Sequence, residues 1–291
     1  MAVVKFRNRG GGLSGNLEDR RAMGGKGIAA GGGVVGIVVV VLLQLLGGGG
    51  GGGIDITDIF GQIQTDGSGS TGTVDPADEP LVQEMSDALD DIQTFWASGD
   101  GLGSGYDDAT LVLFTEGVST GGCGNAPSSV GPFYCPADQQ AYIDLSFFKE
   151  LDTRFGAPGD FARVYVLAHE IGHHVQNLEG TSGGVRQDQQ ADPGRANELS
   201  VRLELQADCY AGLWGRSAQE RGLIEPGDLE EGLGAAEAVG DDSIQEQAGV
   251  EVSSESWTHG SSESRQRWFR NGFDTGDLAK CDTFTIPADQ L

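Results

Sequence analysis

The stretch VYVLAHEIGHHVQNLEG, residues 164–180, contains three of the four histidines of the chain. An apolar run precedes the histidines and no proline interrupts the stretch. The pattern predicts a long buried helix over residues 160–178, with Asp160 as its N-terminal cap. Gly180 follows the helix at the position where a C-terminal glycine commonly ends one.

His169 and His173 are four positions apart, and on a helix of about 3.6 residues per turn both imidazoles lie on one face. Two imidazoles in this arrangement bind one cation, and Glu170 can reach a water on that cation. This is the H-E-x-x-H pattern of zinc hydrolases, and it predicts a catalytic role for Glu170. His174 points about 100° away from His173, so we expect it to pack or to form a hydrogen bond.

A catalytic zinc site needs a third protein ligand and an open position. Downstream, ELQAD provides Glu204 and Asp208 among apolar neighbours, on one face of a predicted helix. A solvated helix face is the alternative, but buried carboxylates require a cation or a hydrogen-bond donor. We assign Glu204 as the third zinc ligand and Asp208 as the hydrogen-bond partner of a ligand histidine. The exchanged assignment remains open.

The fourth histidine, His259, lies in the polar segment SWTHGSSESRQRWF. It is either a surface histidine or a second catalytic residue that stabilises the oxyanion of a tetrahedral intermediate. Arg265 is another candidate for that role. If His259 instead bound the zinc ion, the site would have four protein ligands and would be structural.

The charge of the chain is unevenly distributed. Its 291 residues include 18 basic and 44 acidic ones, a net charge of −26. This balance argues against nucleic acid as a partner, because neutralising phosphates requires a surface of lysine and arginine. Residues 1–26 are basic, whereas residues 27–54 contain no charged side chain.

These features predict a disordered cytoplasmic tail over residues 1–26 and a single transmembrane helix over residues 27–46. A glycine-rich flexible linker is expected over residues 47–78, followed by the folded domain over residues 79–291. Basic residues before the apolar stretch and acids after it place the N-terminus inside and the domain outside the cytoplasmic membrane. The alternative is a cleaved signal peptide, which the long basic region and the following glycines disfavour.

Four cysteines are present, an even number that suggests disulfides in an exported domain. Cys123 and Cys135 bracket a short loop, so we expect them to pair and, by elimination, Cys209 to pair with Cys281. Other connectivities and free buried thiols are the alternatives.

The remaining patterns describe a mainly helical α+β domain with a small early sheet. Residues 181–194 are expected to form a polar loop. A bound peptide would add an edge strand near ATLVLF, residues 109–114, or AYIDL, residues 141–145. Apolar periodicity predicts helices and β-branched runs predict strands: helices over 81–96, 195–222, 229–242 and 261–273, and strands within 109–120 and 141–148.

Several long segments together resemble the bacterial neutral zinc metallopeptidase family of membrane-anchored proteins: KFRNRGGGLSGNLEDRR, GPFYCPADQQAYIDLSFF, AHEIGHHVQNL, RLELQADCYAGLW and THGSSESRQRWFRNGF. The resemblance covers most of the chain apart from the glycine-rich linker. It implies a zincin-like peptidase with a glutamate as third ligand. The family pattern falls on His169, Glu170, His173 and Glu204 without departure.

The resulting hypothesis is a membrane-anchored, zinc-dependent endopeptidase that hydrolyses peptide or protein substrates through a metal-activated water. His169, His173 and Glu204 would hold Zn²⁺, and Glu170 would take and return the proton. Two alternatives remain: a non-catalytic envelope protein with a structural zinc site, and a hydrolase of another amide.

Overall fold

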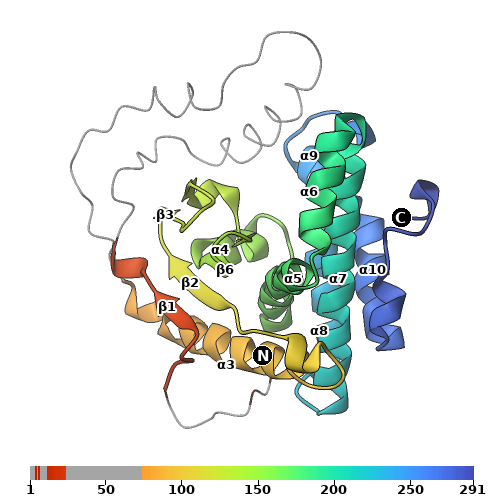
Figure 1. Cartoon of the computed structure of the whole chain (residues 1–291). Coiled ribbons are helices and arrows are strands. Elements are labelled where there is room, and N and C mark those ends of the chain that lie inside the picture. Colours follow the sequence, from red (N-terminus) through yellow and green to blue (C-terminus); the bar gives the residue numbers. More distant parts are fainter. Residues whose placement is uncertain (1–3, 5, 7–11, 24–73) are drawn as a thin grey trace.

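A computed structural model describes residues 4, 6, 12–23 and 74–291 (Figure 1). The predicted anchor at 27–46 and most of the predicted linker lie outside these residues. Within the described part of the chain, none of the helices combines the length and the apolar character that a membrane crossing requires.

The main sheet is small and mixed. Its order is β1-β2-β6-β5, with β1 and β6 parallel to β2 and with β5 antiparallel to β6. A separate antiparallel hairpin joins β3 to β4. The strands are β1 (Leu17–Asp19), β2 (Thr110–Phe114), β3 (Gly117–Ser119), β4 (Asn125–Pro127), β5 (Phe133–Cys135) and β6 (Gln140–Asp144).

This strand order corrects the expectation about the edge strand. The stretches 109–114 and 141–145 form β2 and β6, which are the two central strands and are paired on both sides. The sheet edges are β1 and β5. The edge strand β5 packs against α5, which contains His169 and His173, as does the central strand β6.

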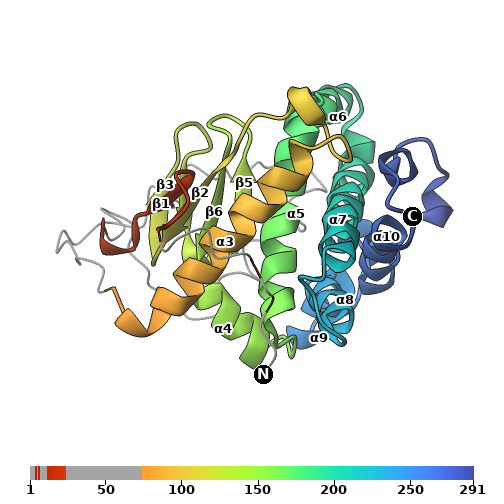
Figure 2. The ribbon, with the colours of Figure 1, turned by 90° about the horizontal axis from the view of Figure 1, so that it is seen from below.

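Helices make up most of the domain, and they pack in layers. Figure 2 shows α5 between the sheet and α7, with α10 on the far side of α7. Trp96, Phe161 and Trp214 are fully buried at these contacts. The helices are α3 (Glu79–Trp96), α4 (Ser146–Thr153), α5 (Asp160–Leu178), α6 (Thr181–Ala191), α7 (Ala196–Glu220), α8 (Asp228–Ala238), α9 (Asp241–Gln247) and α10 (Ser262–Thr275).

The predicted helices are present, except that residues 229–242 do not form a single helix: α8 ends at Ala238 and α9 begins at Asp241. Three further expectations fail. Residues 181–191 form α6 instead of a loop, with Val185 buried against the neighbouring helices. The two glycines of this segment lower its helix propensity, which favoured the prediction of a loop, but tertiary packing stabilises the helix. Helix α5 begins at Asp160 itself, so Gly159, not Asp160, is its N-cap. Residues 12–23 of the predicted disordered tail are folded onto the domain, with Leu17–Asp19 forming β1.

Both predicted disulfides form. Cys123 pairs with Cys135, and Cys209 pairs with Cys281. The second bridge closes a long loop, and it ties the C-terminal segment to α7. Disulfides persist in oxidising compartments outside the cytoplasm, so their presence agrees with an extracytoplasmic domain.

Helices α7 and α10 pack in direct backbone contact. A β-carbon added at Gly212 of α7 would lie 2.0 Å from the carbonyl oxygen of Phe269, and one added at Gly272 of α10 would lie 2.0 Å from that of Cys209. The two backbones therefore touch, and only glycine fits at these positions. This contact sets the distance between α7 and the polar residues at the start of α10.

We predict that Gly212→Ala lowers the free energy of unfolding by about 1–3 kcal/mol or more, because α10 must move away from α7. Gly234→Ala in α8 is the matched control, since its added methyl group meets no atom within 4 Å. That change should stabilise the helix by about 0.5–1 kcal/mol. Thermal unfolding of both variants tests the contact, and equal effects would contradict it.

Candidate active site

The close approach of α5 and α7 brings the predicted metal residues together. Gly172, between the two histidines, lies so near α7 that an added β-carbon would be 3.1 Å from the carbonyl oxygen of Ala207. His169 and His173 of α5 thus face Glu204 of α7 across a narrow gap.

His169, His173 and Glu204 form a candidate metal site. The Nε2 atom of His169 lies 3.1 Å from Oε2 of Glu204, and Nε2 of His173 lies 3.4 Å from Oε1. The three ligand atoms all lie within 4.8 Å of one another. Two imidazole nitrogens and one carboxylate, with a cleft beside them, are the donor set of catalytic zinc sites.

Asp208 contacts the opposite edge of the His169 ring. Nδ1 of His169 lies 2.8 Å from Oδ1 of Asp208, and the Tyr165 hydroxyl donates to the same oxygen at 2.6 Å. Because a carboxylate only accepts, Nδ1 bears the proton, and Nε2 on the other edge of the ring is the atom that faces Glu204. Asp208 is fully buried and does not belong to the metal-site group.

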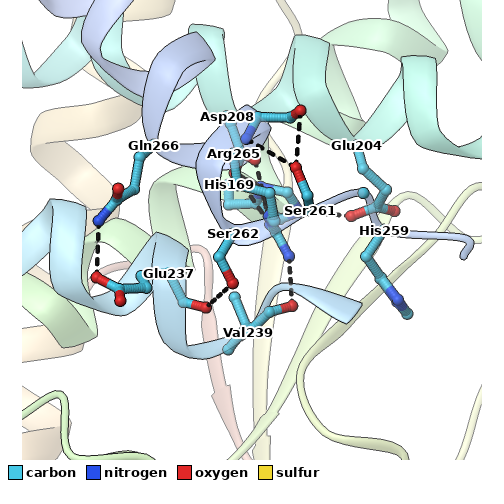
Figure 3. Close-up of polar contacts among 12 residues, drawn as sticks. His169, Glu204, Asp208, Glu237, Val239, His259, Ser261, Ser262, Arg265 and Gln266 are labelled. Atoms are coloured by element: carbon cyan, nitrogen blue, oxygen red, sulfur yellow. Dashed lines mark hydrogen bonds and ion pairs between the residues drawn. The ribbon is translucent and has the colours of Figure 1, made fainter. Parts of the chain in front are cut away.

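Arg265 of α10 clamps Asp208 from the other side (Figure 3). Its Nε and NH2 atoms donate to the two carboxylate oxygens at 2.8 and 2.9 Å, and NH1 donates to the carbonyl oxygen of Val239. The side chain is buried, and it also lines the cleft beside the metal-site residues. Arg265 thus orients Asp208, and its candidate role at the oxyanion stays a prediction.

A second hydrogen-bond chain holds His173, and the sequence patterns did not reveal it. Nδ1 of His173 lies 2.9 Å from Oε1 of Gln176, three positions further along α5. Gln176 is fully buried and donates to the carbonyl oxygen of Leu203 and to Gln206. Gln206 in turn donates to the carbonyl oxygen of Cys281. The i, i+3 spacing of His173 and Gln176 is the sequence feature that could have predicted this contact.

Glu170 is 6 % exposed and borders the same cleft. Among the described residues, its carboxylate has no hydrogen-bond partner, in contrast to Asp208. Burial raises the pKa of Glu170, although His169 and His173 oppose the shift. Burial also disfavours ionisation of Glu204, but His173 and the hydrogen bonds from both histidines outweigh it and lower the pKa of Glu204 well below its usual value. The two carboxyl groups of the site therefore have opposite shifts.

A cleft of about 450 Å³ opens onto these residues. One wall is the free edge of β5, with Phe133 and Tyr134. The apolar part of the lining includes Val130, Phe147, Phe155, Val239 and Ile244, and the polar part comprises the metal-site residues with Tyr165, Glu170, Ser182, Arg186, His259 and Arg265. The cleft is thus suited to an extended chain with apolar side chains.

His259 also lines the cleft, and Asp241 of α9 orients it. Nδ1 of His259 lies 3.0 Å from Oδ1 of Asp241, whose other oxygen accepts from the backbone N–H of His259 at 2.7 Å. Burial lowers the pKa of His259, but the hydrogen bond to Asp241 and the charge of Glu204 raise it overall. Asp241 and Asp242 form an acidic pair, which was expected at the end of the helix predicted over residues 229–242.

His174 is placed as predicted, away from the metal site. Its Nδ1 lies 2.9 Å from the Tyr134 hydroxyl and its Nε2 lies 2.7 Å from the carbonyl oxygen of Asp107. Burial lowers its pKa. A second group of acidic residues, Asp160, Asp228 and Glu231, lies at the start of α5 but offers no nitrogen ligand.

Comparison with known proteins identifies the family. Residues 5–284 match the family described as putative neutral zinc metallopeptidase. The chain belongs to this family. The match covers the metal-site residues and extends into the N-terminal segment.

The chain is similar to proteins of Escherichia coli and Mycobacterium tuberculosis. The protein YpfJ of Escherichia coli (strain K12) is 43 % identical over 279 residues, which cover 93 % of this chain and 96 % of YpfJ. The protein Rv2575 of Mycobacterium tuberculosis (strain H37Rv) is 49 % identical over 192 residues, or 62 % of this chain and 64 % of Rv2575. Both are described as uncharacterized. No solved structure matches the chain significantly.

We predict that Gln176→Ala weakens zinc binding by about 10–100-fold, because the His173 ring loses the acceptor that orients it. Gln189→Ala is the control, since Gln189 bonds to Ala196 and Ser200 away from the site. Competition with a chelator of known affinity gives the binding constants. Equal zinc affinity for both variants would show that Gln176 does not position His173.

Proposed function

We propose that the protein is a zinc-dependent endopeptidase whose zinc ligands are His169, His173 and Glu204. The single observation that supports this most is the convergence of two Nε2 atoms and one carboxylate at the floor of a cleft, with a second carboxylate beside them. Membership of a family described as zinc metallopeptidases supports the same conclusion.

The residues around the site fit a zinc ion. Asp208 and Gln176 each accept from the Nδ1 atom of a ligand histidine, and both Nε2 atoms, the ring atoms that would bind the ion, face Glu204. A zinc ion bound there would lower the pKa of a water toward about 7 and polarise a substrate carbonyl.

Glu170 is the proposed general base. Its carboxylate adjoins the metal site, faces the cleft and is not engaged in a hydrogen bond with any described residue. It would accept a proton from the attacking water and deliver it to the nitrogen of the leaving amine. Its raised pKa suits a group that must both take and return a proton.

His259 is the proposed donor to the developing oxyanion. Asp241 accepts from its Nδ1, so Nε2 is the ring atom that can serve the substrate. A histidine held by a carboxylate in this way retains its proton more readily, as the raised pKa indicates. Donors of this kind stabilise the transition state more than the substrate.

The proposed substrate is an extended peptide that pairs with β5. That strand has a free edge in the described sheet and lies along the cleft. Main-chain hydrogen bonds to β5 would align the peptide, and apolar side chains would enter the space lined by Phe147, Phe155 and Ile244. A peptide fits this surface better than a small amide does.

A structural zinc site is the alternative, and it requires a fourth protein ligand. Among the described residues, the group with ligand atoms within 4.8 Å of one another contains three members and excludes His259. The hydrogen bond to Asp241 holds the His259 ring separately. These features favour an open, catalytic site.

We predict that Glu170→Gln retains zinc in equal amount but loses cleavage of casein or of a peptide library by at least about 10³-fold. The loss follows because a carboxamide cannot accept the proton from water. Zinc content measured by atomic emission and cleavage rates measured on the same samples provide the test. Full zinc in both proteins, with no cleavage by either across many substrates, would favour the structural alternative.

We predict that His259→Ala lowers kcat by about 10²–10³-fold while KM changes little, because the lost contact exists only in the transition state. Zinc content should remain unchanged. Loss of zinc in this variant would instead identify His259 as a fourth ligand. Steady-state kinetics on a cleaved peptide, with zinc quantified in parallel, separates the two roles.

A further inference from the structure

The N-terminal segment, residues 12–23, is an integral part of the metal-site domain. Leu17–Asp19 pair in parallel with Leu111–Leu113 of β2. The N–H of Leu111 donates to the carbonyl oxygen of Asn16, and the N–H of Arg20 donates to that of Leu113, each at 2.8 Å. Figures 1 and 2 both show β1 beside β2, close to α3. The segment therefore completes one edge of the sheet.

Side chains attach the segment to α3 as well. The N–H of Ser14 donates to Oγ of Ser86 at 2.7 Å, and the hydroxyl of Ser14 donates to Asp90 at 2.5 Å. These contacts connect residues more than 70 positions apart in the chain. They hold the beginning of the segment independently of the strand pairing.

Arg21 is the clearest sign that the segment is folded and not solvated. Its side chain is 1 % exposed and forms ion pairs with Asp19 and Glu79, at 2.7 and 2.8 Å. The hydroxyl of Thr115 donates to its carbonyl oxygen. The neighbouring Arg20 is 24 % exposed and forms its ion pair with Glu18, which is itself 48 % exposed. Two adjacent arginines thus have different roles, and the charge of Arg21 is neutralised inside the domain.

These contacts conflict with the topology expected from the sequence. A bilayer core is about 30 Å thick, whereas hydrogen bonds extend about 3 Å. A segment on one side of a membrane cannot form a strand in a domain on the other side. The basic residues that suggested a cytoplasmic tail include Arg21, which the fold uses as a buried ion-pair partner.

We propose that residues 12–23 lie in the same compartment as the metal site, bound to the surface formed by β2 and α3. Residues 12–23 are accordingly extracytoplasmic together with the domain. This proposal does not depend on peptidase activity.

Cysteine labelling of the full-length chain tests the shared compartment. Leu13 and Val252 are 48 % and 42 % exposed, so Leu13→Cys and Val252→Cys are comparable probes in the segment and in the domain. In intact cells with a sealed cytoplasmic membrane, both should react equally, before lysis, with a maleimide that cannot cross that membrane. Reaction of Val252→Cys before lysis and of Leu13→Cys only afterwards would overturn the proposal. Reaction of both only after lysis would support a shared compartment but place it in the cytoplasm, against the extracytoplasmic location.

A pair of arginine variants tests the packing itself. Arg20→Ala and Arg21→Ala each remove one positive charge from the same flank of the apolar stretch. If the flanking charge alone determined the topology, the two variants would therefore behave alike. If the segment is folded, Arg21→Ala lowers the Tm of the full chain by about 4–8 °C, and Arg20→Ala changes it by less than about 1 °C. Failure of Arg21→Ala alone to fold also supports the proposal. Equal, unchanged melting of both variants would refute it.

Discussion

The backbone contact between α5 and α7 at Gly172 is the constraint on which the candidate site depends. A side chain at this position would press on the carbonyl oxygen of Ala207, and α7 would move outward. Glu204 and Asp208 lie one helical turn apart on α7. Because the two helices pack this closely, both carboxylates reach the two edges of the His169 ring. The metal-site geometry is thus a consequence of how closely two helices pack.

The two ligand histidines are supported by different networks. His169 is held by a charged group, Asp208, which Arg265 and Tyr165 hold in turn. His173 is held by the neutral chain of Gln176 and Gln206, which ends at the backbone of Cys281. The Cys209–Cys281 disulfide therefore fixes both α7 and the last acceptor of the neutral chain. Elements distant in sequence, among them α10 and the C-terminal segment, converge on one pair of imidazoles.

The N-terminal segment changes the interpretation of the whole chain. Its composition alone is that of a basic tail before an apolar stretch, yet residues 17–19 form a sheet edge and Arg21 is buried. The family match, which begins at residue 5, includes this segment with the domain. With β1 in place, β1 and β5 are the two edge strands of the main sheet, and residues of β5 line the cleft.

The sequence by itself determined helix α5 and its span, residues 160–178, with the pair His169 and His173. It also determined the second long helix, with Glu204 and Asp208. Helical periodicity is local, so residue spacing is sufficient to place side chains on one face. Only the tertiary structure decided which carboxylate meets Nε2 and which meets Nδ1, because that depends on the distance between α5 and α7. It also revealed Gln176 and Asp241 as partners of histidines, α6 in place of a loop, β5 as the free edge, and the strand formed by residues 17–19. Each of these depends on contacts between segments far apart in the chain or on packing that offsets weak local propensity, and spacing along the sequence does not encode them.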